Sequence, residues 1–185
     1  MLYHVSKTHG LKVLKPQVST HGKAYVYAVD NVVTGLLFGA KQDDFDFIIS
    51  VNEDGIPEIY ECYRNAFREI YEGVSCSVYE IDGTGFLKGI TGWDAEYVSE
   101  NEAEVLSETI VGDLYVRLCD EERNRNLVVH RFEDIDEYKG IISNHIVDRL
   151  IRAEILDRPC IDERLVKRYG NIIEKIRELI SGRYL

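Results

Sequence analysis

The sequence has few residues of the kinds that interrupt regular structure or form covalent cross-links. It contains 3 prolines and 4 cysteines among 185 residues, and Met and Trp occur once each. The cysteines include no Cys-x-x-Cys pair, and none has a histidine nearby at the spacing of a zinc site. We therefore expect reduced thiols and no metal. The four are Cys62, Cys76, Cys119 and Cys160.

Long apolar runs and excess positive charge are also missing. No run reaches the roughly 18 apolar residues of a membrane span, and no charged segment followed by an apolar run marks a signal peptide. We expect a cytoplasmic protein that does not enter the membrane. Lys and Arg number 22 against 33 Asp and Glu, a formal net charge of -11. This charge repels a phosphate backbone, which argues against general nucleic-acid binding.

The residues that are present fall into two regimes along the chain. Up to about residue 132, short β-type runs alternate with glycines, which predicts an α+β domain over 1–132. Beyond it the apolar period becomes that of helices, which predicts a helical extension over 133–185. We expect strands at 2–6, 24–29, 45–51, 58–62, 76–81, 95–99, 104–110 and 127–132, with short helices at 31–38 and 64–71.

The predicted extension consists of two amphipathic helices separated by Arg158-Pro159. Their apolar faces need a partner, which is each other, the preceding domain, or a second molecule in a homodimer or a partner protein. The first stripe is Ile142, Ile146, Leu150, Ile151 and Ile155, and the second is Leu165, Tyr169, Ile172, Ile173, Ile176, Leu179 and Ile180.

Three of the predicted strands carry side chains that are able to line a cleft. Because side chains alternate along a strand, His4 and Ser6 share one face of the first strand. Tyr25 and Tyr27 share one face of the second for the same reason. The third strand carries Glu96 near its start. Along the chain, the order of these residues is therefore His, Tyr, Glu.

These segments together resemble the ADP-ribosyltransferase fold of the diphtheria-toxin and poly(ADP-ribose) polymerase type, whose NAD site is a His-Tyr-Glu set. The likeness rests on the order of the three residues, on Gly22-Lys23 before the tyrosines, and on Glu96-Tyr97-Val98 at the start of the third strand. It spans roughly residues 2–131. The resemblance implies a split, strongly bent β-sheet core, followed here by the two-helix extension.

The resemblance also implies roles for the first strand. His4 would hydrogen-bond the adenosine ribose, and the main chain at Val5 would hold the nicotinamide carboxamide. The Ser6 hydroxyl would support the ribose. The family has glycine at the position of Val5, so here a branched side chain stands beside the carboxamide position.

In the second strand, Tyr27 matches the family's site tyrosine, and Tyr25 lies on the same face. A ring at Tyr27 would stack on the nicotinamide. A helix should follow, because Asp30 or Asn31 can cap it. Phe38 stands where the family supplies a second aromatic residue that clamps the other face of the nicotinamide.

In the third strand, Glu96 would accept a hydrogen bond from the 2′-hydroxyl of the nicotinamide ribose. Breaking the glycosidic bond of NAD builds positive charge on that ribose, and a fixed carboxylate stabilises the charge. Glu104 and Glu108, on a neighbouring predicted strand, are alternative candidates for the site glutamate.

The function that the resemblance implies is transfer of ADP-ribose from NAD, as substrate, to a protein, nucleic acid or small molecule, or hydrolysis of NAD. The segment 83–92, with Trp93 at its end, would choose the acceptor. One alternative is a non-catalytic module with the same core, whose terminal helices bind a protein partner, and another is a purely structural protein. An RNA 2′-phosphotransferase would need clustered arginines, and none precedes Arg64.

Overall fold

The computed structural model describes residues 1–18, 22–134 and 139–181. The chain divides into two compact units, each built from segments that are separate in the sequence. Residues 135–138 and 182–185 of the predicted extension lie outside the described part. The predicted boundary after residue 132 stays a prediction. Unit 1 comprises Met1–Gln42, Ile49–Ile59 and Phe67–Val129, and unit 2 comprises Asp43–Ile48, Tyr60–Ala66 and His130–Leu185.

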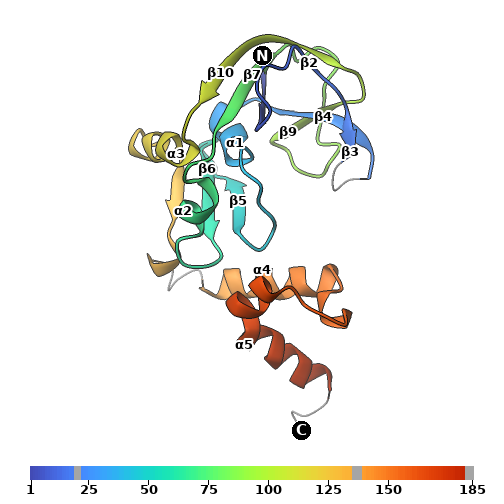
Figure 1. The fold of residues 1–185 in the computed structure, drawn as a ribbon, viewed down its shortest axis with the longest axis vertical. Helices are drawn as coiled ribbons and strands as arrows, with labels where there is room; N and C mark the ends of the chain where they lie inside the picture. The colour runs from blue at the N-terminus through green and yellow to red at the C-terminus, as the bar shows by residue number, and fades with distance from the viewer. Residues whose placement is uncertain (19–21, 135–138, 182–185) are drawn as a thin grey trace. The chain divides into compact units, whose positions relative to one another are not determined.

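A large antiparallel sheet dominates unit 1 (Figure 1). The strand order is β2-β10-β7-β1-β4-β9-β8, and β3 pairs with β4 off this path. Strands β1, β4 and β9, which carry the candidate His, Tyr and Glu, are therefore consecutive neighbours. The bounds are β1 (Leu2–Ser6), β2 (Val13–Leu14), β3 (Gln17–Val18), β4 (Ala24–Val29), β7 (Cys76–Ile81), β8 (Leu87–Lys88), β9 (Glu96–Ser99) and β10 (Ala103–Val111).

One face of this sheet is apolar and forms a core of its own. Leu2 lies directly opposite Ile81 in the pairing of β1 with β7, so the two side chains share a face. Each large side chain buried in this way contributes about 1.5–3 kcal/mol. The cluster consists of Leu2, Leu14, Val26, Ala28, Tyr79, Ile81 and Ala103.

Helix α1 (Val32–Leu37) follows β4 and begins at a side-chain cap. Oδ1 of Asn31 accepts from the backbone N–H of Val33 at 2.8 Å and of Thr34 at 3.3 Å, so two free amides of the first turn gain a partner. Residues 33–37 are all buried. The sequence predicts this helix and its cap, and both are confirmed.

Helix α3 (Leu114–Arg123) is not among the helices that the sequence analysis predicts. It begins at Asp113, whose carboxylate accepts from the N–H of Val116 at 3.1 Å. Its inward face is narrow, with Leu114 and Leu118 fully buried. The short strands β2, β3 and β8 were also missed, because two residues show no periodicity.

A second sheet has three strands in the order β11-β6-β5. A short helix, α2 (Ala66–Tyr71), follows β6, and its Tyr71 hydroxyl donates to the carbonyl oxygen of Leu37 at 2.8 Å. A 3₁₀ turn, η1 (Phe132–Asp134), follows β11. The strands are β5 (Phe47–Val51), β6 (Pro57–Glu61) and β11 (Val128–His130).

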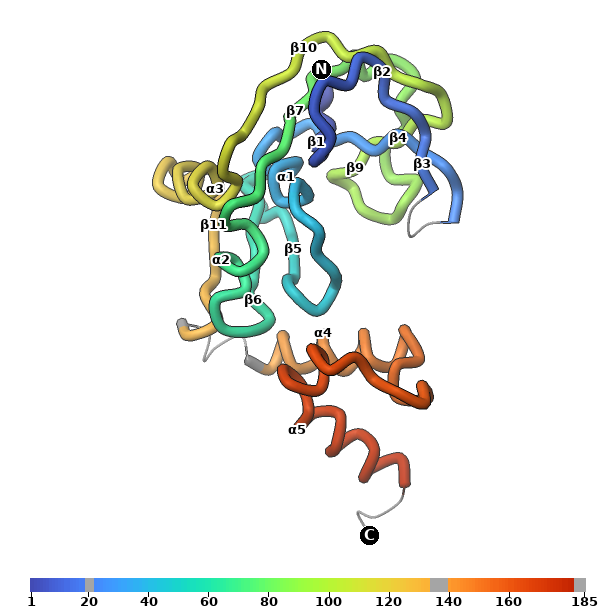
Figure 2. Tube along the Cα trace, viewed as in Figure 1, coloured from blue at the N-terminus to red at the C-terminus, as the bar shows by residue number. Residues whose placement is uncertain are grey.

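Helices α4 (Lys139–Arg152) and α5 (Glu163–Ile180) confirm the two predicted amphipathic helices of unit 2 (Figure 2). A 3₁₀ turn, η2 (Ile155–Asp157), lies between them. Their apolar faces pack on each other and on two residues from earlier in the chain, Phe45 and Cys62. The helical members of this buried cluster are Ile142, Ile146, Leu150, Leu165, Tyr169, Ile173 and Ile176.

Unit 2 is also held by charge pairs between α5 and the segment that contains Phe45. Arg164 contacts the carboxylate of Asp43 at 2.8 Å, and Arg168 contacts that of Asp46 at 3.1 Å. Asp46 is buried, and this burial raises the pKa of its carboxyl group. The Tyr169 hydroxyl donates to the carbonyl oxygen of Phe45 at 2.6 Å. The predicted α+β class is thus confirmed at the level of mixed helices and sheets.

Candidate functional site

The register of the large sheet decides which candidate side chains share a face. Val29 on β4 lies opposite Glu96 on β9, so these two side chains point to the same side. Tyr27 is two residues before Val29 and therefore points the same way. The structure thus brings Tyr27 and Glu96 together on one face of two adjacent strands.

His4 does not share that face by strand alternation. Tyr3, not His4, lies opposite Val29 in the pairing of β1 with β4. His4 instead lies opposite Tyr79 on β7, and the two ring centroids are 6.3 Å apart. In an untwisted sheet, His4 would point away from Glu96.

The imidazole of His4 nevertheless contacts the main chain of β4. Its Nδ1 lies 2.8 Å from the carbonyl oxygen of Tyr27. Since a carbonyl oxygen only accepts, Nδ1 carries the proton, and Nε2 is the nitrogen with a lone pair in the neutral ring. Burial lowers the pKa of His4 below its ordinary value of 6.5, partly offset by this hydrogen bond. At neutral pH the ring is therefore an uncharged group that can accept a hydrogen bond from a ligand hydroxyl.

Ser6 lies on the same side of β1 as His4, as the sequence predicts. Its Oγ accepts from the backbone N–H of Thr8 at 3.1 Å, which turns the chain after the strand. The hydroxyl proton is not used in that bond. Ser6 can therefore still donate to a ligand while it holds the turn.

Val5 fills the space between β1 and α1. A Cβ atom at Gly35 would lie 3.0 Å from Cγ2 of Val5, and one at Gly39 would lie 3.1 Å from its Cγ1. The two methyl groups thus pack where the helix has no side chains. The main chain at Val5, to which the resemblance assigns the nicotinamide carboxamide, is covered on this side by its own side chain.

The aromatic residues are arranged differently from the expected pair. Tyr25 is buried and meets the Tyr27 ring edge-on, with centroids 5.9 Å apart. Phe38 follows α1 and is 46% exposed. Its aromatic neighbour is Trp93, at a centroid distance of 5.4 Å and an interplanar angle of 61°. That Phe38 faces Tyr27 across the nicotinamide stays a prediction.

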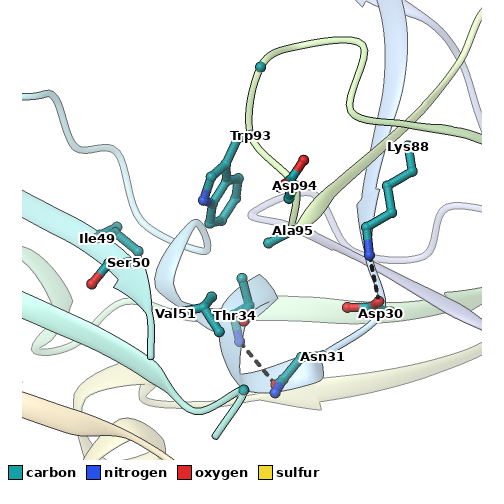
Figure 3. A pocket seen from close by; sticks show the side chains of 12 residues that line it. Asp30, Asn31, Thr34, Ile49, Ser50, Val51, Lys88, Trp93, Asp94 and Ala95 are labelled. Atoms are coloured by element: carbon teal, nitrogen blue, oxygen red, sulfur yellow. Dashed lines mark hydrogen bonds and ion pairs between the residues drawn. The ribbon is translucent and has the colours of Figure 1, made fainter. Parts of the chain in front are cut away.

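A cleft of about 620 Å³ opens beside Trp93, just before the start of β9. We call it the Trp93 cleft. Figure 3 shows Trp93, Asp94 and Ala95 along one side and Ile49, Ser50 and Val51 of β5 along the other. Glu96 directly follows Ala95, and its N–H donates to the carbonyl oxygen of Trp93 at 3.1 Å. The remaining lining residues are Asp30, Asn31, Thr34, Gly55, Lys88 and Gly92.

A small polar network closes one end of the Trp93 cleft. The Tyr97 hydroxyl donates to Oδ2 of Asp30 at 3.0 Å, and Nζ of Lys88 lies 3.8 Å from the same oxygen. The Lys88 ammonium also lies 5.1 Å from the centroid of the Tyr97 ring. The hydrogen bond to Tyr97 is the main cause that raises the pKa of Lys88. The sequence alone does not identify Asp30, Lys88 and β5 as parts of the site, because they are far apart in the chain and β5 belongs to the other sheet.

The two alternative glutamates lie on β10, which is separated from β4 by β7 and β1. Oε1 of Glu108 accepts from the N–H of Gly10 at 2.8 Å and from the Ser77 hydroxyl at 2.6 Å. The bond from Gly10 is the main cause that lowers the pKa of Glu108. Glu104 is exposed and lines a separate cavity of about 310 Å³. Of the three glutamates, Glu96 is the one on a strand next to that of Tyr27.

Within residues 1–18, 22–134 and 139–181, no group of three or more His, Cys, Asp or Glu side chains is placed to hold a metal ion. No helix in that same part of the chain has both the length and the apolar character needed to cross a bilayer. Comparisons with protein-family models, with curated proteins and with solved structures find no match to this chain.

Proposed function

We propose that this chain binds NAD where β1, β4 and β9 meet, and that it transfers ADP-ribose to an acceptor or to water. The observation that carries the proposal is the placement of Tyr27 and Glu96 on one face of adjacent strands, beside the Trp93 cleft. We also propose that the β-sheet core is similar to that of the ADP-ribosyltransferases. The proposal also includes a cytoplasmic location with reduced cysteines.

In the proposed reaction the bond between C1′ of the ribose and the nicotinamide nitrogen breaks. Its electron pair leaves with nicotinamide, which departs as a neutral molecule. Glu96 would stabilise the positive charge left on the ribose, and a nucleophile of the acceptor then bonds to C1′ and gives up a proton to solvent. Nε2 of His4 would accept from a hydroxyl of the adenosine ribose, because Nδ1 already donates to Tyr27.

A test measures nicotinamide released from NAD by the purified protein. Glu96→Gln keeps the shape of the side chain but removes its charge, so release should slow on the order of a hundredfold or more with NAD affinity retained. Tyr27→Ala should weaken NAD binding first, since it removes the stacking ring.

Glu104→Gln is the matched control, because it removes a carboxylate from β10 instead of β9. It should release nicotinamide at the wild-type rate. If nicotinamide release is lost in the Glu104 variant and kept in the Glu96 variant, the site glutamate lies on β10 and the assignment to β9 is wrong. Absence of release from the wild type with every acceptor tried would reject the transferase proposal.

One observation favours a second candidate, a non-catalytic module with the same core. Val5 packs against Gly35 and Gly39, so a branched side chain stands where the family has glycine beside the carboxamide position. In that case the protein works through a partner surface such as α4 and α5. Thermal melting distinguishes the two candidates. If NAD binds, the free energy of unfolding of the protein rises by about 2.7 kcal/mol at a hundredfold excess of NAD over its dissociation constant. No shift at millimolar NAD would favour the non-catalytic module.

A further inference from the structure

The side chains that line the Trp93 cleft carry more negative than positive charge. Its lining includes two carboxylates, Asp30 and Asp94, and one ammonium, Lys88, so its formal charge is -1. Asp30 is engaged by both Lys88 and the Tyr97 hydroxyl. Asp94 is exposed at the mouth of the cleft, beside Trp93 in the sequence. Lys88 is also attracted to Asp94, but less than to Asp30, so most of the excess negative charge lies at Asp94.

Trp93 presents an aromatic surface next to that carboxylate. Its ring meets Phe38 edge-on and is half-buried. Of these two rings, that of Trp93 lines the cleft. Figure 3 shows the ring standing at the side of the cleft, with Asp94 adjacent to it. A tryptophan face is the best aromatic partner for a cation, and a carboxylate beside it adds a second attraction.

We propose that the Trp93 cleft binds the guanidinium group of an arginine side chain on a polypeptide. A guanidinium is planar, so it stacks on the indole while its N–H groups bond the Asp94 carboxylate, and it sheds its water more readily than an ammonium. The net charge of -11 favours basic polypeptides in general and disfavours nucleic acid. Binding at this cleft does not require that the chain transfer ADP-ribose.

The separate cavity of about 310 Å³ that Glu104 lines, here called the second cavity, allows a comparison within the same protein. It is lined by three carboxylates, Asp82, Glu102 and Glu104, yet its lining contains no tryptophan. Negative charge alone would make it at least as attractive to a cation as the Trp93 cleft. The proposal instead assigns binding to the place where charge and an indole ring coincide.

Trp93 is the single tryptophan of the sequence, so its fluorescence reports on this cleft alone. The experiment titrates the intact protein with arginine amide and, separately, with citrulline amide, in which a neutral urea replaces the guanidinium. Arginine amide should change the emission with a dissociation constant on the order of a millimolar, as expected for one side chain. Citrulline amide should change it at least about tenfold more weakly.

Two matched variants locate the carboxylate that binds. Asp94→Asn should weaken arginine amide on the order of tenfold, because a charge-assisted bond becomes a neutral one. Glu102→Gln removes one charge from the second cavity and should leave the titration unchanged.

Equal binding of the two amides would overturn the proposal. So would an unchanged titration in the Asp94 variant, and so would equal losses in the two variants, which would indicate diffuse charge attraction. Nicotinamide release is measured without arginine amide, so failure of the proposed function leaves this result intact.

Discussion

At the residue scale, the structure shows how much one side chain can decide about a site. Val5 stands between the main chain of β1 and two glycines near α1, and its methyl groups fill the gap. The sequence reveals that a branched residue replaces glycine here. It does not reveal that Gly35 and Gly39 face this side chain, because that depends on how the helix packs on the strand.

Val5→Gly should open this space and raise NAD affinity and nicotinamide release several-fold. The same change should lower stability, because a buried apolar side chain is lost and glycine weakens a strand by about 0.5–1 kcal/mol. Titration of NAD followed by melting and by nicotinamide release measures both effects. Val29→Gly is the control, since its Cγ2 also lies near Gly35, at 3.2 Å from a Cβ built there, but it leaves β1 intact. A similar gain in the control would show that loosening alone explains the effect.

The proton on His4 gives a pH prediction. Because burial lowers its pKa below 6.5, the folded state binds fewer protons than the unfolded state between the lowered value and 6.5. Stability should therefore fall as the pH drops from 6.5 through that window, and it should be recovered as the pH rises. NMR titration of the imidazole, assigned by its absence in His4→Gln, should give a midpoint below 6.5. A midpoint at or above 6.5 contradicts the buried, singly bonded ring.

At the element scale, prediction from sequence succeeded where a local pattern was long enough. The bounds of β1, β4 and β7 match the predicted strands, and the predicted cap of α1 is present. The apolar stripes of α4 and α5 are buried or partly buried as predicted except at Ile151, Leu179 and Ile180, which are exposed. Helix α3 was missed because its buried face is narrow and the helix follows closely after β10. The common face of Tyr27 and Glu96 depends on register, which alternation within one strand cannot supply.

The contact of α1 with β1 predicts opposite outcomes for two glycines. Gly35→Ala would gain up to about 1 kcal/mol of helix propensity, but its Cβ would press on Val5 at 3.0 Å and Val29 at 3.2 Å. Overpacking of this kind costs about 1–3 kcal/mol, so the variant should be less stable. Gly140→Ala meets nothing within 4 Å and should be neutral or slightly stabilising. Chemical denaturation measures the free energy of unfolding of both variants. A Gly35 variant as stable as the wild type would mean that β1 shifts to accept the added methyl group at little cost.

At the scale of the whole molecule, unit 2 was the least predictable part. Its buried cluster unites α4 and α5 with Phe45 and Cys62, which lie in segments that read as ordinary strands. In the structure both residues lie just outside β5 and β6, and no local pattern marks a residue there that packs on a helix about a hundred residues later. The sequence therefore predicts two helices whose apolar faces need a partner. The structure shows that Phe45 and Cys62 are part of the surface that covers them.

Deleting residues 134–185 should expose Phe45 and Cys62 and leave the buried carboxylate of Asp46 without Arg168. We expect a lower melting temperature and aggregation, because an apolar patch and an unpaired charge are both unfavourable in water. Size-exclusion chromatography and thermal melting measure the outcome. Ile151→Ala, at a 55% exposed position of α4, is the mild control and should behave as the wild type. A truncated chain that stays monomeric and equally stable would show the helices to be dispensable.

The hydrogen bond between Tyr169 and Phe45 joins residues 124 positions apart in the chain. During translation at roughly 5–20 residues per second, Phe45 is therefore made about 6–25 s before its partner exists. For that interval the apolar side chains of 43–48 and 60–66 have no helix to cover them, and Asp46 has no arginine. Unit 2 can only be completed once α5 has been made, so the earlier segments of this unit stay uncovered until that late step of synthesis.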